Sequence, residues 1–415
     1  MSNSDDLNTA AILPRSKPMS IFNKCYNFTA AEEVRKLGMY PYFREISSAP
    51  DNEVTIDGQK VIMIGSNNYL GLTNHPKVLE RVHKAVDKYG SGCTGSRFLN
   101  GTLDIHVELE EKLAEYMKTE TALIFSTGFM TNLGTISTLV GKSEYVFTDR
   151  GDHASIVDGC RLSFGQIVKY RHNDMDDLER LMSRVDKEAA KLIVTDGVFS
   201  MEGDIVKLPR LVEIAEEYNA GVLVDDAHSI GVLGDNGRGT ASHYHLEDKV
   251  DLTMGTFSKS FASIGGYIAG NKQLIEYIKH FSRPLIFSAS MPPSAVATVL
   301  ATLEIIQEEP ERQKRLWDIT HRMHKEFSDM GFDLGTSETP IIPIYVRDDN
   351  MEEMKTFQFW RMLTDEGLFT NPVIPPAVAP NQSLIRTSYT ATHTDDQLDK
   401  VLDIFYRAGK KFGII

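Results

Sequence analysis

The sequence predicts an α/β fold with a large domain, built on a mainly parallel seven-stranded sheet covered by helices, and a smaller C-terminal α+β domain. Three observations support this prediction. The chain has 415 residues, too many for one small domain. Short apolar runs alternate with amphipathic segments along its middle, as expected for parallel strands joined by helices. After residue 300 the alternation gives way to a mixed pattern of strands and long helices.

The elements follow in order along the chain. Residues 1–20 have little periodicity and are expected to form a flexible arm, followed by a short amphipathic helix over 30–37 that ends at Gly38. A hairpin is predicted over 54–64, with Asp57 and Gly58 at its turn. Strands of the large sheet are expected at 121–125, 145–148, 191–196, 222–226, 252–255, 266–269 and 285–287. A long helix over 292–309 leads to a strand at 340–346, a helix at 351–366, a strand at 383–389 and a helix at 394–411. We therefore expect an N-terminal arm with a helix and the start of the hairpin at 1–60, a large domain at 61–300 and a small domain at 301–415.

Composition excludes several classes of protein. Hydrophobic residues make up 41% and charged residues 25% of the chain, as in globular proteins, and no run of roughly 18 apolar residues could span a bilayer. The net charge of −14 argues against nucleic-acid binding, because a phosphate backbone would be repelled. Nothing at the start resembles a secretory signal. Three scattered cysteines, Cys25, Cys93 and Cys160, favour free thiols in a reducing cytoplasm.

Lys259 is the first candidate catalytic residue. It follows the predicted strand 252–255, with hydroxyl groups at Thr256 and Ser258. A lysine at a strand end among small residues can lose solvation, which lowers its pKa and prepares the amine for imine chemistry. A single lysine in such a position is more often simply a solvated loop residue, and the rest of the chain decides between the two interpretations.

Two carboxylates and an imidazole, from Asp225, Asp226 and His228, follow another apolar strand. Pyridoxal phosphate needs one carboxylate against its pyridinium nitrogen, so that the ring can accept electrons. Asp225 at the strand end fits that role, and His228 could bond to the ring hydroxyl. The alternative is a capping aspartate with a surface histidine.

A phosphate site is predicted where a strand meets a helix, at Ser126, Thr127, Gly128 and Phe129. Backbone N–H groups at a helix start bind phosphate, and Thr256 and Ser258 could complete the site. An ordinary helix N-cap is the alternative. His153, in a turn after another strand, could stack on the cofactor ring or simply be exposed.

Other motifs are weaker. Residues 90–95 match GxGxxG, but a helical pattern precedes them where a dinucleotide site requires a strand. His243 and His245 have no third ligand nearby, so we predict no metal site. Arg386 lies in an apolar strand and needs an anion, either a substrate carboxylate or an internal carboxylate.

Taken together, these residues resemble the α-oxoamine synthases, pyridoxal-phosphate enzymes of fold type I that condense an amino acid with an acyl-CoA thioester and release carbon dioxide. The matching segments run in order along the chain, at 65–72, 90–110, 126–129, 196–204, 225–228 and 256–259. Within this family, segments 95–106 and 287–291 are most similar to the soluble bacterial serine palmitoyltransferases. The proline-rich segment 375–380 matches only loosely.

The resemblance implies a role for each candidate residue. Lys259 would form the Schiff base and then serve as the α-proton base, Asp225 would face the pyridinium nitrogen, His228 the ring hydroxyl, and His153 would stack on the ring. Asn67 and Arg386 would contact the substrate carboxylate. In a homodimer with active sites at the subunit interface, Ser288 would reach the neighbouring subunit's phosphate.

The expected reaction joins L-serine to a long-chain acyl-CoA, palmitoyl-CoA, and gives 3-ketosphinganine, CoA and carbon dioxide, the first step of sphingolipid biosynthesis. Such an enzyme could contact a membrane peripherally, because its product is a lipid. Three alternatives stay open. They are a sister synthase that uses glycine with acetyl-CoA or alanine with a pimeloyl thioester, a non-catalytic subunit, and a nicotinamide dehydrogenase. The presence of Lys259, Asp225 and His228 disfavours the second, and the glycine context disfavours the third.

Overall fold

The computed structural model describes residues 20–348 and 351–415, in two units that we treat separately, 1–43 and 44–415. The first unit has two short helices, α1 (Asn23–Tyr26) and α2 (Ala30–Lys36). Helix α2 confirms the amphipathic helix predicted at 30–37, and it ends one residue earlier than predicted. The flexible arm predicted at 1–20 falls, but for its last residue, outside the described residues.

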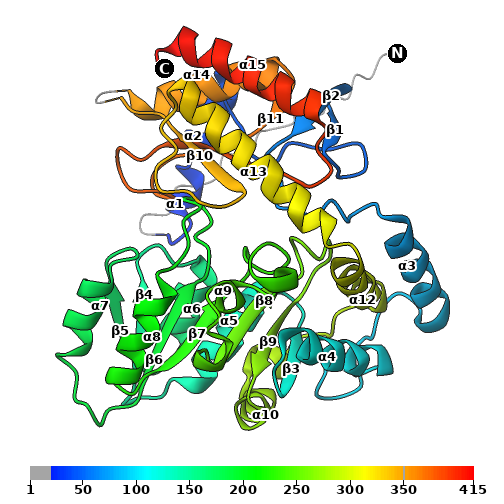
Figure 1. Ribbon diagram of the computed structural model, residues 1–415, viewed down its shortest axis with the longest axis vertical. Helices are drawn as coiled ribbons and strands as arrows, with labels where there is room; N and C mark the ends of the chain where they lie inside the picture. The colour runs from blue at the N-terminus through cyan, green and yellow to red at the C-terminus, as the bar shows by residue number, and fades with distance from the viewer. Residues whose placement is uncertain (1–19, 349–350) are drawn as a thin grey trace, which may run out of the picture. The chain divides into compact units, whose positions relative to one another are not determined.

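The second unit is built on a seven-stranded sheet with the order β3-β9-β8-β7-β6-β4-β5 (Figure 1). Its strands are β3 (Thr121–Phe125), β4 (Tyr145–Asp149), β5 (Gln166–Tyr170), β6 (Lys191–Asp196), β7 (Gly221–Asp225), β8 (Leu252–Thr256) and β9 (Gly266–Gly270). The pairs from β5 to β8 are parallel, and β9 runs antiparallel to both of its neighbours. The predicted mainly parallel, seven-stranded fold is confirmed.

In the seven-stranded sheet, one predicted strand is wrong and one strand was missed. Residues 285–287 lie in and after a short helix, α11 (Arg283–Ile286), which Pro284 opens in its first turn. A short apolar run does not distinguish the two states. The seventh strand is β5, at the sheet edge, where four of its five residues are at least partly exposed. A polar edge strand lacks the apolar run of a buried strand.

Helices cover both faces of the sheet because side chains alternate between the faces along each strand. On β7, Leu223 packs with helices α5 (Gly128–Leu139), α6 (Ala154–Leu162) and α10 (Lys272–Phe281). Its neighbours Val222 and Val224 pack on the other face with α7 (Met175–Met182) and α8 (Leu208–Glu217). Further along that face lie α3 (Pro76–Tyr89), α4 (Asp104–Met117) and α12 (Pro293–Glu308).

The remaining elements form two small sheets. The hairpin β1 (Glu53–Ile56) and β2 (Gln59–Met63) is as predicted, and β2 also pairs with β11 (Leu368–Phe369). The other sheet has the order β10-β13-β12, with bounds Ile341–Tyr345, Leu384–Ser388 and Asn371–Val373. Helices α13 (Glu311–Met330), α14 (Glu352–Asp365) and α15 (Asp395–Phe412) pack with Ile62 of β2 in one apolar core. The domain boundaries at 60 and 300 stay a prediction.

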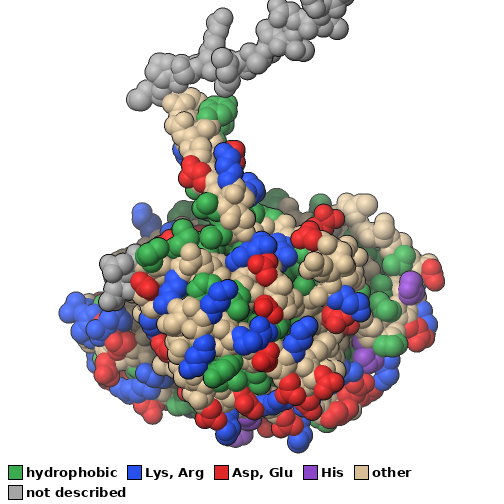
Figure 2. Space-filling model, turned by 90° about the horizontal axis from the view of Figure 1, so that it is seen from above, with side chains coloured by type: hydrophobic (Ala, Val, Ile, Leu, Met, Phe, Trp, Pro, Cys, Tyr) green, Lys and Arg blue, Asp and Glu red, His purple; other side chains and the backbone are tan. Residues whose placement is uncertain are grey.

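The surface carries charges of both signs. On the face seen in Figure 2, Lys and Arg side chains are interleaved with Asp and Glu rather than gathered into a block of one sign. Within the described parts of the chain, no helix combines the length and the apolar character needed to cross a bilayer.

Candidate active site

A cavity of about 320 Å³ opens beyond the carboxyl ends of the central strands, where ligands bind in open α/β sheets. Most of the predicted cofactor residues line this cavity: Thr127, Gly128, Phe129, His153, Asp225, His228, Thr256, Ser258 and Lys259. Ser288, Asn67 and Arg386 do not line it.

Lys259 follows β8, all five residues of which are buried. Its side chain is partly exposed, toward the cavity. Burial lowers the pKa of Lys259 to about 8, although the negative charges of Asp225 and Asp196 oppose this shift. A lysine with this pKa supplies a neutral, nucleophilic amine at physiological pH far more readily than a solvated lysine.

Asp225 ends β7 with 2% of its surface exposed. Its Oδ2 accepts a 2.6 Å hydrogen bond from the Asn132 side-chain amide, and its Oδ1 accepts one of 2.9 Å from the backbone N–H of Ala227. The neighbouring Asp226 points elsewhere and accepts bonds from the backbone and hydroxyl of Thr240, and burial raises its pKa to about 7. Of the two acids, only Asp225 lines the cavity.

His228 is buried, and its Nδ1 lies 2.7 Å from the hydroxyl of Tyr69. Burial, and then the positive charges of Lys259 and Arg386, hold its pKa well below the usual value. The imidazole is therefore neutral at physiological pH, and one ring nitrogen stays available to a ligand in the cavity.

His153 is the N-cap of α6, and its exposed ring lines the cavity. Its backbone N–H donates to Oδ2 of Asp196 at 2.8 Å, and its Nδ1 lies 2.7 Å from Oγ of Ser155. The rings of His153 and Phe129 meet edge to face, with centroids 6.4 Å apart. These contacts fix the turn and hold an aromatic ring at the wall of the cavity.

The start of α5 provides the predicted phosphate site. Thr127 caps this helix by accepting from the N–H of Met130, and the first free N–H groups of the helix lie at the cavity. The hydroxyls of Thr256 and Ser258 are 2.9 Å apart beside it. A Cβ on Gly128 would lie 2.6 Å from Oγ1 of Thr256, so only glycine allows this close approach.

Arg386 lies in the middle of β13 with 5% of its surface exposed. Its Nη2 donates to Oδ1 of Asn67 at 3.0 Å, and its Nε donates to the carbonyl of Ser200 at 2.6 Å. No carboxylate among the described residues forms an ion pair with it, which disfavours the internal salt bridge. Asn67 connects Arg386 to the cavity. Its Oδ1 is 3.4 Å from the hydroxyl of Tyr69, and that hydroxyl contacts His228, which lines the cavity.

The competing motifs take no part in this site. The GxGxxG segment follows helix α3, and the next helix, α4, begins only at Asp104, so neither flank fits a dinucleotide fold. Ser288 is partly exposed after α11. Among the described residues, one group has the chemistry and spacing to hold a metal ion, and it comprises His172, Glu202 and Asp204 rather than His243 or His245.

Four residues of the site were missed as functional residues: Tyr69, Asn132, Ser155 and Asp196. Asn132 lies on α5, the helix that Thr127 caps, and its side chain reaches both Asp225 and Oγ of Ser155. Asp196 ends β6 beside Asp225 in parallel register. The sequence offered two signals: the position of Asp196 at a strand end next to another strand-end acid, and the matching segments 65–72 and 196–204, which contain Tyr69 and Asp196.

The donor set fits pyridoxal phosphate. The cavity joins an amine of lowered pKa, a carboxylate fixed by two donors, an imidazole and a helix N-terminus with two hydroxyls. These groups match the aldehyde carbon, ring nitrogen, ring hydroxyl and phosphate of that cofactor.

The comparisons with known proteins agree with this chemistry. Residues 59–405 match the family model described as aminotransferase class I and II. The chain is 54% identical to the serine palmitoyltransferase of Sphingobacterium spiritivorum, over 93% of this chain and 96% of that protein.

Two further comparisons bear on fold and specificity. A high-resolution structure of SPT with PLP internal aldimine superposes with a TM-score of 0.91 at 39% identity, covering 96% of this chain and all of that one (100%). The 8-amino-7-oxononanoate synthase of Thermoanaerobacter pseudethanolicus is 44% identical over 92% of this chain and 96% of that protein.

Proposed function

The chain belongs to the aminotransferase class I and II family, and we propose, from its 54% identity to a serine palmitoyltransferase, that it acts as a serine palmitoyltransferase. It condenses L-serine with a long-chain acyl-CoA and releases CoA and carbon dioxide. The cofactor is pyridoxal phosphate, which supplies an electron sink for negative charge at the amino-acid α-carbon. The observation that supports this proposal most strongly is the single cavity in which Lys259, Asp225 and His228 meet.

The residues around the cofactor would divide the work. Lys259 would hold the cofactor through Nζ and, once free again, take the α-proton of the substrate. Asp225, kept in place by Asn132 and the Ala227 N–H, would keep the ring nitrogen protonated. His228, neutral and bonded to Tyr69, would donate to or accept from the ring hydroxyl.

The substrate would be held from the small sheet. Arg386 has no carboxylate partner of its own among the described residues, and two of its nitrogens are already fixed by Asn67 and Ser200. Such a fixed guanidinium can clamp an α-carboxylate and orient the bond that breaks. His153 would cover the ring and donate to the oxygen that becomes negative during acyl transfer.

We also propose that the enzyme works as a homodimer in which Ser288 of one protomer reaches the cofactor phosphate of its partner. In its own chain Ser288 does not line the cavity, and its neighbour Phe287 is 75% exposed. Cytoplasmic location and peripheral membrane contact stay predictions.

The test is a matrix of substrates on the purified protein, with release of free CoA as the readout. Serine, glycine and alanine are each combined with palmitoyl-CoA, acetyl-CoA and pimeloyl-CoA. Serine with palmitoyl-CoA should give the highest kcat/KM. Faster turnover of alanine with pimeloyl-CoA would instead support the sister activity, that of the relative to which the chain is 44% identical. No turnover with any pair, in protein that holds the cofactor, would support the non-catalytic alternative.

A further inference from the structure

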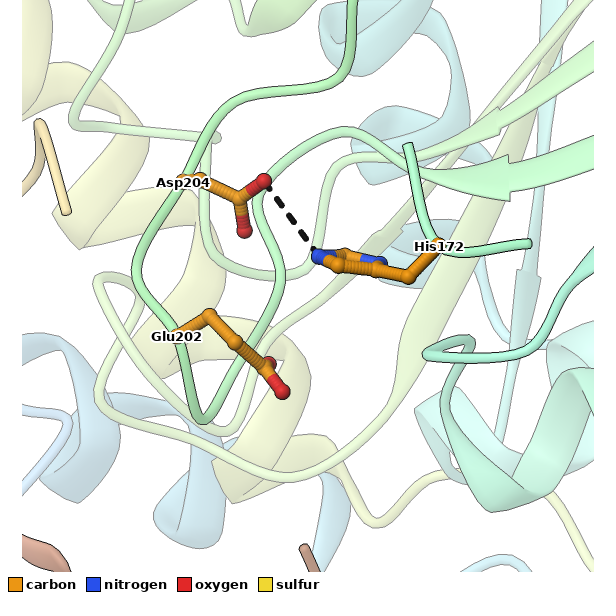
Figure 3. A group of neighbouring side chains, drawn as sticks. All are labelled: His172, Glu202 and Asp204. Carbon is orange, nitrogen blue, oxygen red and sulfur yellow. Dashed lines mark ion pairs between the residues drawn. The ribbon is translucent and has the colours of Figure 1, made fainter. Parts of the chain in front are cut away.

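A second group of charged residues lies outside this cavity, and the mechanism above makes no use of it. His172 follows β5 and stands between two buried acids, Asp149 at the end of β4 and Asp204. Its Nδ1 is 3.0 Å from Oδ1 of Asp149, and its Nε2 is 3.4 Å from Oδ2 of Asp204. Figure 3 shows the ring pointing at Asp204, with Glu202 beside them.

The imidazole of His172 lies between two acids. Nδ1 of His172 is within hydrogen-bonding distance of Asp149, whereas Nε2 has no hydrogen-bond partner among the described residues and meets Asp204 only as an ion pair. Burial alone would lower the pKa of His172, but the contacts with Asp149 and Asp204 outweigh it and raise the pKa to about 10. His172 is therefore a cation across the physiological range.

The ring of His172 packs against a tight turn formed by residues 198–205. Residues 198 and 205 form an isolated bridge, and within the turn the N–H of Phe199 donates to the carbonyl of Asp204. The ring of Phe199 meets His172 edge to face, with centroids 4.4 Å apart. Asn173, next to His172, donates from its side chain to Oδ2 of Asp204 at 2.8 Å.

Ser200, at the tip of the turn, contacts Arg386, the proposed clamp for the substrate carboxylate. Ser200 lines the cavity, and its carbonyl accepts the 2.6 Å bond from Nε of Arg386. The carbonyl of Gly203 accepts from Oγ1 of Thr339, just before β10, at 2.9 Å. The turn thus connects the large sheet to the strand pair that carries Arg386.

We propose that His172 is a positioning residue for the amino-acid substrate. Its ring contacts Asp149 at the end of β4 and both Phe199 and Asp204 in the turn 198–205, and the turn fixes the Ser200 carbonyl that aims Arg386. This inference rests on the proposed function, because it assigns to Arg386 the substrate carboxylate. His172 itself touches neither cofactor nor substrate.

The test compares the holoenzyme with His172→Gln, which removes the charge but keeps a polar side chain. The control is His280→Gln on α10, where a half-exposed histidine also meets an acid, Glu276. Cofactor content and absorbance should match the wild type in both. In His172→Gln the Kd for serine, read from the change in cofactor absorbance, should rise about tenfold, equivalent to about 1.4 kcal/mol. The KM for serine should rise with it, while kcat at saturating serine should change less than about threefold.

A double-mutant cycle separates positioning from general damage. Once Arg386→Ala has removed the clamp, His172→Gln should weaken serine binding by less than about twofold more, because the two residues act through one path. Fully additive effects would overturn the inference. If His172→Gln fails to fold, Asp204→Asn removes the other partner of the His172–Asp204 ion pair. This variant should show the same rise in the Kd for serine.

Three further outcomes are decisive. A wild-type Kd for serine in folded His172→Gln holoenzyme would refute the positioning role and leave the proposed function intact. Metal analysis should find no divalent ion bound at this site. One ion per chain that is lost in His172→Gln would mean that Nε2 donates a lone pair, and it would overturn the assignment of a cationic His172. A wild-type protein that does not respond to serine at all would instead contradict the proposed function.

Discussion

The side-chain amide of Asn132 on α5 donates a 2.6 Å hydrogen bond to Oδ2 of Asp225 at the end of β7. Asn132 is fully buried and Asp225 is 2% exposed, so water does not compete for this bond. The same amide reaches Oγ of Ser155, which lies 2.7 Å from the ring of His153. One side chain thus connects the acid below the cofactor site to the histidine at its wall.

We expect Asn132→Leu, which has a similar volume and no donor, to weaken cofactor binding. Loss of a hydrogen bond to a buried charge costs roughly 1.5–3 kcal/mol, so the Kd for pyridoxal phosphate should rise at least about tenfold. Equilibrium dialysis followed by absorbance measures it.

The matched control for this variant is Thr138→Ala, a change of a partly exposed polar residue near the far end of the same helix. It should bind the cofactor as the wild type does. Equal affinity in Asn132→Leu and Thr138→Ala would show that Asp225 does not depend on its buried donor.

The rate of cofactor capture by protein stripped of cofactor should depend on pH through Lys259. Burial lowers the pKa of this amine from 10.5 to about 8, and only the neutral amine attacks an aldehyde. Below pH 8 the rate should rise about tenfold per pH unit, and above it the rate should level off. Stopped-flow absorbance across pH 6 to 10 gives the profile. A rate that still climbs steeply above pH 9 would mean that Lys259 is an ordinary solvated lysine.

Arg386→Lys should impair serine binding although it keeps the positive charge. One ammonium cannot reproduce the planar fork that donates to Asn67 and Ser200 and still faces a carboxylate. We expect the KM for serine to rise at least about tenfold, with the KM for acyl-CoA and the cofactor absorbance unchanged. Arg347→Lys, at a half-exposed arginine paired with Asp333, is the control. If Arg386→Lys raised the KM for serine and the KM for acyl-CoA equally, the result would point to a general disturbance of the fold.

Much of the site could be predicted because it lies where strands end. Asp225, Lys259 and the helix start at Gly128 each follow an apolar run that is readable in the sequence, and the sheet edge brings them together. Asn132 could not be predicted in the same way. It is a mid-helix residue whose partner is 93 positions away, and only the packing of α5 on the sheet brings it to Asp225.

The fold shows the same limit. Buried strands such as β8 were recognised from their apolar runs, whereas the edge strand β5 depends on pairing with β4 that no local pattern encodes. Likewise, the partners of Arg386 come from segments 319 and 186 positions away, so its environment emerges only from the tertiary structure.

The central claim is that Lys259 holds the cofactor, and borohydride reduction of the purified holoenzyme tests it most directly. Reduction makes the link between cofactor and amine permanent, so that peptide mass spectrometry can locate it. We predict one modified residue per chain, Lys259, and neither modification nor turnover in Lys259→Ala. A modification on another lysine, or turnover that survives Lys259→Ala, would contradict the account.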